Sequence, residues 1–132
     1  MPHLAFAQLE QHQWKDRVLL IFAKNEKHPH FLAQTKLLEQ QKAALLDRDL
    51  LTYKLFSDNT GHYTDDTPLD TTQAGAFQDR FNPEKQNFLM ILIGKDGGVK
   101  LRSDQPVPPS SLFGLIDGMP MRRAELRRKK SG

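Results

Sequence analysis

Residues 87–103 read NFLMILIGKDGGVKLRS, and they give the strongest indication of the fold. Residues 88–93 are an unbroken apolar run bounded by turn residues, which indicates a strand buried on both faces. Residues 95–98 favour a tight turn, because an Asp-Gly step accepts the positive φ angles that a hairpin requires. We therefore expect a central strand with an antiparallel neighbour over residues 99–102, in a domain that is covered on both sides.

Three more segments show the periodicity of regular structure. Residues 17–23 form a second run of apolar side chains and predict another central strand. Residues 29–47 predict one long helix, because apolar residues recur at heptad spacing from Phe31 and because Pro29 suits a first helical turn. Residues 50–56 alternate apolar and polar side chains, which is typical of a strand with one wetter side. We expect this strand at an edge of the sheet.

Capping residues mark the remaining helices. Asp70 or Thr71 is expected to cap a short helix that ends before the next Asn-Pro step. Ser110 is expected to cap the following helix, and Pro120 begins a last, basic helix of one or two turns. Residues 57–66 are expected to form a polar loop, since turn-forming residues dominate them.

The predicted order of elements is β-α-β-α-β-β-α, followed by a tail helix. A right-handed crossover joins the first two strands in parallel, and the two unbroken apolar strands belong at the centre. A mixed four-stranded sheet flanked by helices, in the order second–first–third–fourth, satisfies these constraints; this is the thioredoxin-like α/β arrangement. We expect a single domain over residues 1–132, with a core of about residues 14–118 and a basic tail over residues 119–132.

The composition excludes several kinds of protein. The chain has no cysteine, which removes disulfides, thiolate nucleophiles and thiolate-ligated metal sites. No apolar run approaches the roughly 20 residues of a membrane-spanning helix, and the first residues show no signal-peptide pattern. The net charge of +3 is a property of the tail, because six cations between Arg122 and Lys130 face only Glu125. The rest of the chain is slightly acidic.

Four motifs carry a resemblance to a known family. LIGKDGGVKLRS (residues 92–103) and LIDGMPMRRAE (residues 115–125), with WKDR (residues 14–17) and DRDL (residues 47–50), resemble a family of uncharacterised bacterial domains. That family is related to the C-terminal domains of the extracellular animal proteins SRPUL and equarin, the P-DUDES group. The resemblance covers roughly residues 14–125. It implies a peroxiredoxin-like or thioredoxin-like fold and no particular activity, and it suggests a periplasmic or extracellular location.

The loop before the first long helix is a candidate site. In thioredoxin-like domains a cysteine pair occupies this place, whereas here the segment reads Lys27-His28-Pro29-His30. Thiol–disulfide and cysteine-peroxidase catalysis are therefore excluded. A helix N-terminus beside Lys27, His28 and His30 is suited to a phosphate, sulfate or carboxylate. The alternative is that these residues are solvated and surround a structural proline. The two histidines lack a third ligand in their motif, so we predict neither a metal nor a cofactor.

The basic tail is the second candidate site. It carries four arginines at spacings of about one helical turn: Arg122, Arg123, Arg127 and Arg128. Such a cluster attracts an acidic protein, an anionic membrane surface or a nucleic acid. The absence of interleaved aromatic residues argues against nucleic acid. As an alternative, Arg122 and Arg123 pair with carboxylates of the domain such as Asp117 or Asp96.

Two functional hypotheses follow from these observations. The first is a non-catalytic thioredoxin-like binding module whose partner is a protein or another acidic molecule. The alternative is a small-anion-binding protein, or a non-thiol enzyme, that uses Lys27, His28 and His30. The sequence predicts no oligomeric state.

Overall fold

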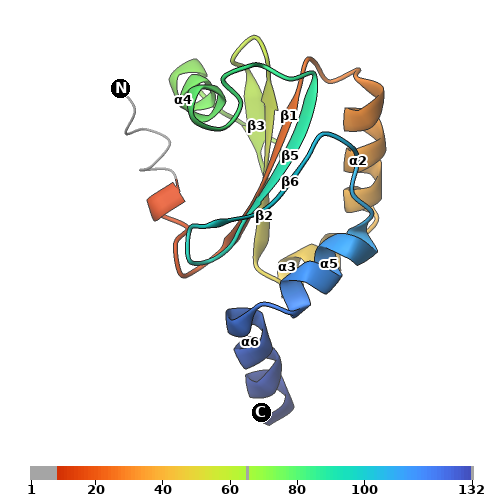
Figure 1. The fold of residues 1–132 in the computed structure, drawn as a ribbon, viewed down its shortest axis with the longest axis vertical. Coiled ribbons are helices and arrows are strands. Elements are labelled where there is room, and N and C mark those ends of the chain that lie inside the picture. Colours follow the sequence, from red (N-terminus) through yellow and green to blue (C-terminus); the bar gives the residue numbers. More distant parts are fainter. Residues whose placement is uncertain (1–8, 65, 132) are drawn as a thin grey trace.

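The computed structural model describes residues 9–64 and 66–131, and for the last two of these the backbone only. Figure 1 shows an open sheet with helices on both of its faces. The strands are β1 (Arg17–Ala23), β2 (Leu50–Phe56), β3 (Gly61–Tyr63), β4 (Thr67–Pro68), β5 (Phe88–Ile93) and β6 (Val99–Ser103). The labelled helices are α2 (Pro29–Glu39), α3 (Lys42–Asp47), α4 (Thr71–Phe81), α5 (Pro109–Asp117) and α6 (Pro120–Ser131).

The sheet is mixed and has six strands in the order β4-β3-β2-β1-β5-β6. The predicted order of the four longer strands is confirmed: β1 lies parallel to β2 and antiparallel to β5, and β5 pairs with β6. The predicted number of strands is wrong, because β3 and β4 extend the sheet beyond β2. The α/β class and the helices on both faces are confirmed.

Strand β2 is therefore not an edge strand, and residues 57–66 are not simply a loop. The chain reverses after β2 at Asn59, whose φ is 63°, and the Phe56 N–H donates to the Thr60 carbonyl over 2.9 Å. Strand β3 then pairs with β2 and places Gly61 against Leu55. A Cβ at Gly61 would lie 2.4 Å from the Lys54 carbonyl oxygen, so only glycine permits this close pairing.

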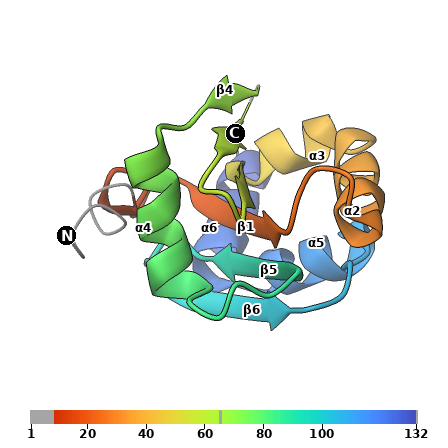
Figure 2. The same cartoon turned by 90° about the horizontal axis from the view of Figure 1, so that it is seen from above.

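The two faces of the sheet bury separate apolar clusters. In β1, Leu20 and Phe22 point toward α4, whereas Leu19 and Ile21 point toward α2 and α5. All seven residues of β1 are buried, and so are all six of β5. Figure 2 shows α4 on one side of these strands and α2, α3 and α5 on the other. The prediction that two unbroken apolar runs form the centre of the sheet is confirmed.

Two helix predictions need correction. The expected helix over residues 29–47 is divided, since α2 ends at Glu39 and α3 begins at Lys42 after Gln41 leaves the helical region with φ −125° and ψ 29°. The break redirects the chain toward the start of β2. Ser110 is not a cap, because α5 already begins at Pro109 and its N-cap is Pro108, without a side-chain bond. The tail helix α6 is longer than expected, at 12 residues.

The cap of α4 allows a direct test of local stability. The Asp70 carboxylate accepts a hydrogen bond of 2.7 Å from the backbone N–H of Gln73. We expect Asp70→Ala to lower the free energy of unfolding by about 1 kcal/mol, because an N–H at the start of α4 loses its acceptor. Urea denaturation followed by circular dichroism measures this. Thr71→Ala is the control, and an equal loss in both variants would contradict the assignment of the cap.

Candidate functional site

The loop before α2 brings the two predicted histidines together. The centroids of the His28 and His30 rings lie 5.3 Å apart, and both rings contact Phe88. His28 is the N-cap of α2, and its Nδ1 accepts a hydrogen bond of 3.1 Å from the backbone N–H of His30. Lys27 is exposed.

In this arrangement, part of the backbone at the start of α2 cannot donate a hydrogen bond to an anion. Pro29 has no N–H to offer, and the N–H of His30 is already bonded to the His28 ring. Both imidazoles are half-buried beside Phe88. The geometry favours the alternative in which these residues cap the helix around a structural proline, and anion binding by the loop stays a prediction. Within the part of the chain that the structure describes, no three histidine or acidic side chains gather as metal ligands.

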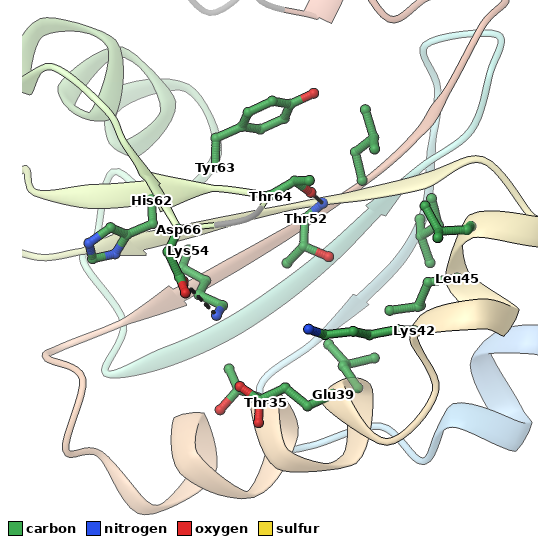
Figure 3. A pocket seen from close by; sticks show the side chains of 14 residues that line it. Thr35, Glu39, Lys42, Leu45, Thr52, Lys54, His62, Tyr63, Thr64 and Asp66 are labelled. Atoms are coloured by element: carbon green, nitrogen blue, oxygen red, sulfur yellow. Dashed lines mark hydrogen bonds and ion pairs between the residues drawn. The ribbon is translucent and has the colours of Figure 1, made fainter.

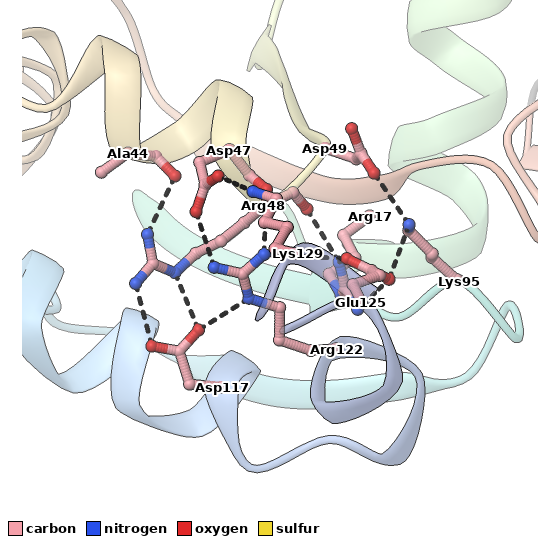
Figure 4. A network of polar contacts seen from close by, with 10 residues as sticks. All are labelled: Arg17, Ala44, Asp47, Arg48, Asp49, Lys95, Asp117, Arg122, Glu125 and Lys129. Atoms are coloured by element: carbon pink, nitrogen blue, oxygen red, sulfur yellow. Dashed lines mark hydrogen bonds and ion pairs between the residues drawn. The ribbon is translucent and has the colours of Figure 1, made fainter. Parts of the chain in front are cut away.

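A cluster of charged side chains joins α6 to the domain (Figure 4). Its members come from the start of β1, the end of α3 and the turn that follows it, the β5–β6 turn, the end of α5 and α6 itself. We call them the α6 charge cluster: Arg17, Asp47, Arg48, Asp49, Lys95, Asp117, Arg122, Glu125 and Lys129. All but Lys129 lie in the four short motifs that the sequence singles out. Motifs far apart in the sequence therefore meet at one place in the fold.

Glu125 is the centre of one half of the α6 charge cluster. Its carboxylate accepts hydrogen bonds from both terminal nitrogens of Arg17, at 3.3 and 3.1 Å, and from Lys95 Nζ at 2.8 Å. Lys95 also contacts Asp49 at 2.8 Å. The side chains of Arg17, Lys95 and Glu125 are only 1%, 7% and 11% exposed. Burial makes each of these charges dependent on its partners.

Arg122 is the centre of the other half. Its Nε donates to Asp117 at 2.9 Å, and its Nη2 donates to Asp47 at 2.7 Å. Arg48 contacts the same Asp117 carboxylate at 3.1 and 2.9 Å. Arg122 is only 2% exposed. Its hydrogen bond to Asp117 confirms the alternative in which this arginine pairs with a carboxylate of the domain. Asp96 instead forms an ion pair with Lys100 at 2.8 Å.

The other predicted tail residues lie on the surface of α6. Arg122, Glu125 and Lys129 recur at the spacing of one helix face and point toward the domain. Arg123, Arg127 and Arg128 are exposed. The structure therefore divides the predicted arginines into one that fixes the helix and three that the helix presents to solvent.

Three carboxylates of the α6 charge cluster, those of Asp47, Asp117 and Glu125, have lowered pKa values. For Glu125 and Asp117, burial acts to raise the pKa, but the hydrogen bonds from Arg17 and Lys95, and from Arg48 and Arg122, outweigh it. The hydrogen bonds from Lys129 and Arg122 lower the pKa of Asp47 to about 2. Each carboxylate is therefore more acidic in the folded protein than in an unfolded chain.

We expect acid to weaken the attachment of α6. Because the pKa of Asp47 is lower in the folded state, the stabilising effect of this carboxylate is complete above about pH 5 and is lost as the pH falls through about 2. Asp47→Asn should destabilise the protein at pH 7, and the difference from wild type should shrink as the pH falls through about 2. Urea denaturation at a series of pH values measures this. The control is Asp79→Asn on α4; a difference between D47N and wild type that did not change with pH would contradict the role of Asp47.

A groove with a volume of about 160 Å³ lies between α2–α3 and the β2–β3 hairpin (Figure 3). Leucines form part of its lining, and the charged residues of the lining are Glu39, Lys42, Lys54 and Asp66, with Thr52 and His62 among its polar residues. Sequence reasoning missed this site, because it requires the break between α2 and α3 and the added strand β3. The alternation of β2, which places Thr52 and Lys54 on one face, was the available signal.

Comparison with known proteins identifies the family and no activity. None of the helices in the described residues combines the length and apolar character needed to cross a membrane. No curated protein matches the sequence. A family model described as "Domain of unknown function (DUF4174)" matches residues 8–125. This range includes every member of the α6 charge cluster except Lys129. Because the match spans most of the chain, the protein belongs to the DUF4174 family.

Proposed function

We propose that the protein is a non-catalytic binding module, of thioredoxin-like topology, that engages an acidic protein partner through the outer face of α6. One observation carries this proposal: the α6 charge cluster fixes the helix to the domain while Arg123, Arg127 and Arg128 remain exposed. The parallel β1–β2 crossover with antiparallel β5 and β6 and the P-DUDES resemblance support the thioredoxin-like assignment.

The attachment of α6 gives its arginines a defined arrangement. A helix fixed to a domain presents its side chains with less loss of conformational entropy on binding than a mobile tail does. Arginine forms bidentate bonds with carboxylates, and complementary charge accelerates encounter with a partner. The outer face of α6 therefore suits aspartate and glutamate side chains.

The residues around α6 favour a protein over other polyanions. Phe113 is the aromatic residue of α5, and the Arg48 guanidinium lies over its ring at 4.2 Å, so this ring is not free to stack on a base. The exposed apolar residues of α5 and α6, Leu115 and Met121, are 41% and 36% exposed. Two partly exposed side chains offer little area for insertion into a bilayer.

Binding of a labelled 20-residue poly-glutamate tests the proposal. We expect saturable binding at low ionic strength that Arg123→Glu/Arg127→Glu weakens by about tenfold. Lys15→Glu/Lys36→Glu is the matched control, because it makes the same change in net charge at two exposed lysines elsewhere. Equal loss in both variants would show a net-charge effect and overturn the proposal. Tighter binding to phosphatidylserine vesicles or to single-stranded DNA than to poly-glutamate would overturn it as well.

A further inference from the structure

The groove between α2–α3 and the β2–β3 hairpin has an apolar end formed by leucines of three elements. Leu38 of α2 and Leu50 of β2 are buried at its base, and Leu45 of α3 packs beside them. Leu46 also lines the groove and is 69% exposed, the highest value among the large hydrophobic residues of the described chain. A ligand with an aliphatic segment would cover this exposed surface.

The polar lining of the groove includes two lysines and a threonine hydroxyl, together with the acidic Glu39 and Asp66. Figure 3 shows the side chains of Lys42, Thr52 and Lys54 extending into the same space. Lys54 contacts Asp66 at 3.6 Å, but the Asp66 side chain is 81% exposed, so this pair is weak. Among the described residues, the Lys42 ammonium has no hydrogen-bond or ion-pair partner, although the side chain lines the groove.

A leucine lining and the ammonium of Lys42, unpartnered among the described residues, suit an amphipathic anion within one groove. We propose that the groove binds a monocarboxylate with a short aliphatic chain. Its carboxylate would accept hydrogen bonds from Lys42 Nζ and the Thr52 hydroxyl, and its chain would lie along Leu38, Leu45 and Leu46. The volume of about 160 Å³ is close to that of an engineered cavity of about 150 Å³ that binds benzene. This size suits about six buried carbon atoms, so octanoate is a suitable probe.

Titration of the ¹⁵N-labelled full chain with octanoate, followed by NMR, tests the site. We expect saturable shifts of amides in α2, α3, β2 and β3. Lys42→Gln should weaken octanoate binding by about tenfold, because a bond to a charged group is lost, and Thr52→Val by about threefold. Both residues lie outside the apolar clusters, so these variants should keep the fold. Lys36→Gln, at an exposed lysine of the preceding helix α2 that does not line the groove, should leave the affinity unchanged.

Two other probes separate this ligand from its alternatives. Octan-1-ol has the same chain without the carboxylate, and we expect it to bind more weakly than octanoate and to be insensitive to Lys42→Gln. Shifts that do not saturate, or equal binding of octanoate by wild type and Lys42→Gln, would overturn the proposal. The second probe is a tripeptide with an acetylated N-terminus and a C-terminal leucine carboxylate. If this tripeptide bound more tightly than octanoate, the groove would be a peptide site and the proposal would be overturned. None of these outcomes depends on α6.

Discussion

Replacing Glu125 by alanine is expected to destabilise the protein by about 3–5 kcal/mol, because it leaves the buried Arg17 without a carboxylate partner and leaves Lys95 with Asp49 alone. Arg17 is 1% exposed and Lys95 is 7% exposed, so water does not replace the lost carboxylate while α6 covers them. The total free energy of unfolding of a domain is about 5–15 kcal/mol. This single substitution therefore removes a large share of it.

The expected cost follows from the burial of the groups left behind. Asp117→Ala removes a carboxylate of the same cluster, but Arg122 keeps its bonds to Asp47, and we expect a smaller loss. Glu39→Ala, at an exposed glutamate of α2, is the control. Urea denaturation at pH 7 measures all three. A loss below about 1 kcal/mol for Glu125→Ala, the range of a surface ion pair, would show that α6 does not cover Arg17 and Lys95.

The sequence predicted the centre of the fold because its signals are local. An unbroken apolar run such as Phe88–Ile93 has one stable environment, a strand buried on both faces, and the observed β5 has these bounds. The turn at residues 95–98 has a similar local cause. Gly97 has a positive φ of 84°, and the Asp96 carboxylate accepts a hydrogen bond from the Gly98 N–H at 2.9 Å.

The elements that the sequence did not predict depend on contacts between distant residues. Strand β3 has only three residues, and its pairing with β2 gives it stability that its own sequence does not signal. The polar side of β2 suggested an edge strand exposed to water, but Thr52 and Lys54 line the groove. No glycine or proline marks the break between α2 and α3, so periodicity alone predicted one helix.

The residues of the α6 charge cluster stand in recognisable sequence motifs, but the sequence does not show that these residues contact one another. Charged residues are usually exposed, and the sequence alone left open whether the tail arginines bind a partner or pair with carboxylates of the domain. Arg17 stands directly before the first apolar run and Lys95 stands in the hairpin turn, and both contact Glu125. Their common partner lies 108 and 30 residues away along the chain. Of the expected tail pairs, that between Arg122 and Asp117 joins neighbours in sequence and is confirmed, whereas Asp96 pairs with Lys100 instead.

The second large effect is expected at the centre of the sheet. Phe22→Ala should destabilise the protein by about 3–5 kcal/mol, because it removes a buried ring and leaves a cavity between the sheet and α4. Phe22 is 0% exposed, and in the sheet it stands between Leu55 of β2 and Leu89 of β5. Leu46→Ala, at an exposed leucine, is the control and should change the stability by less than about 0.5 kcal/mol.

The pH dependence distinguishes this apolar contribution from that of Glu125, although the two losses are similar at pH 7. The pKa of Glu125 is lowered in the folded protein, so wild type itself loses the stabilising carboxylate when the pH falls below that value. The difference between wild type and Glu125→Ala should therefore shrink in acid. The difference for Phe22→Ala should persist, since a buried phenyl ring binds no proton. Urea denaturation at pH 7 and pH 3 measures both differences. If the loss of stability in Phe22→Ala vanished in acid, α4 would not cover this face of the sheet in the folded state. A cavity costs free energy only where other side chains pack around it.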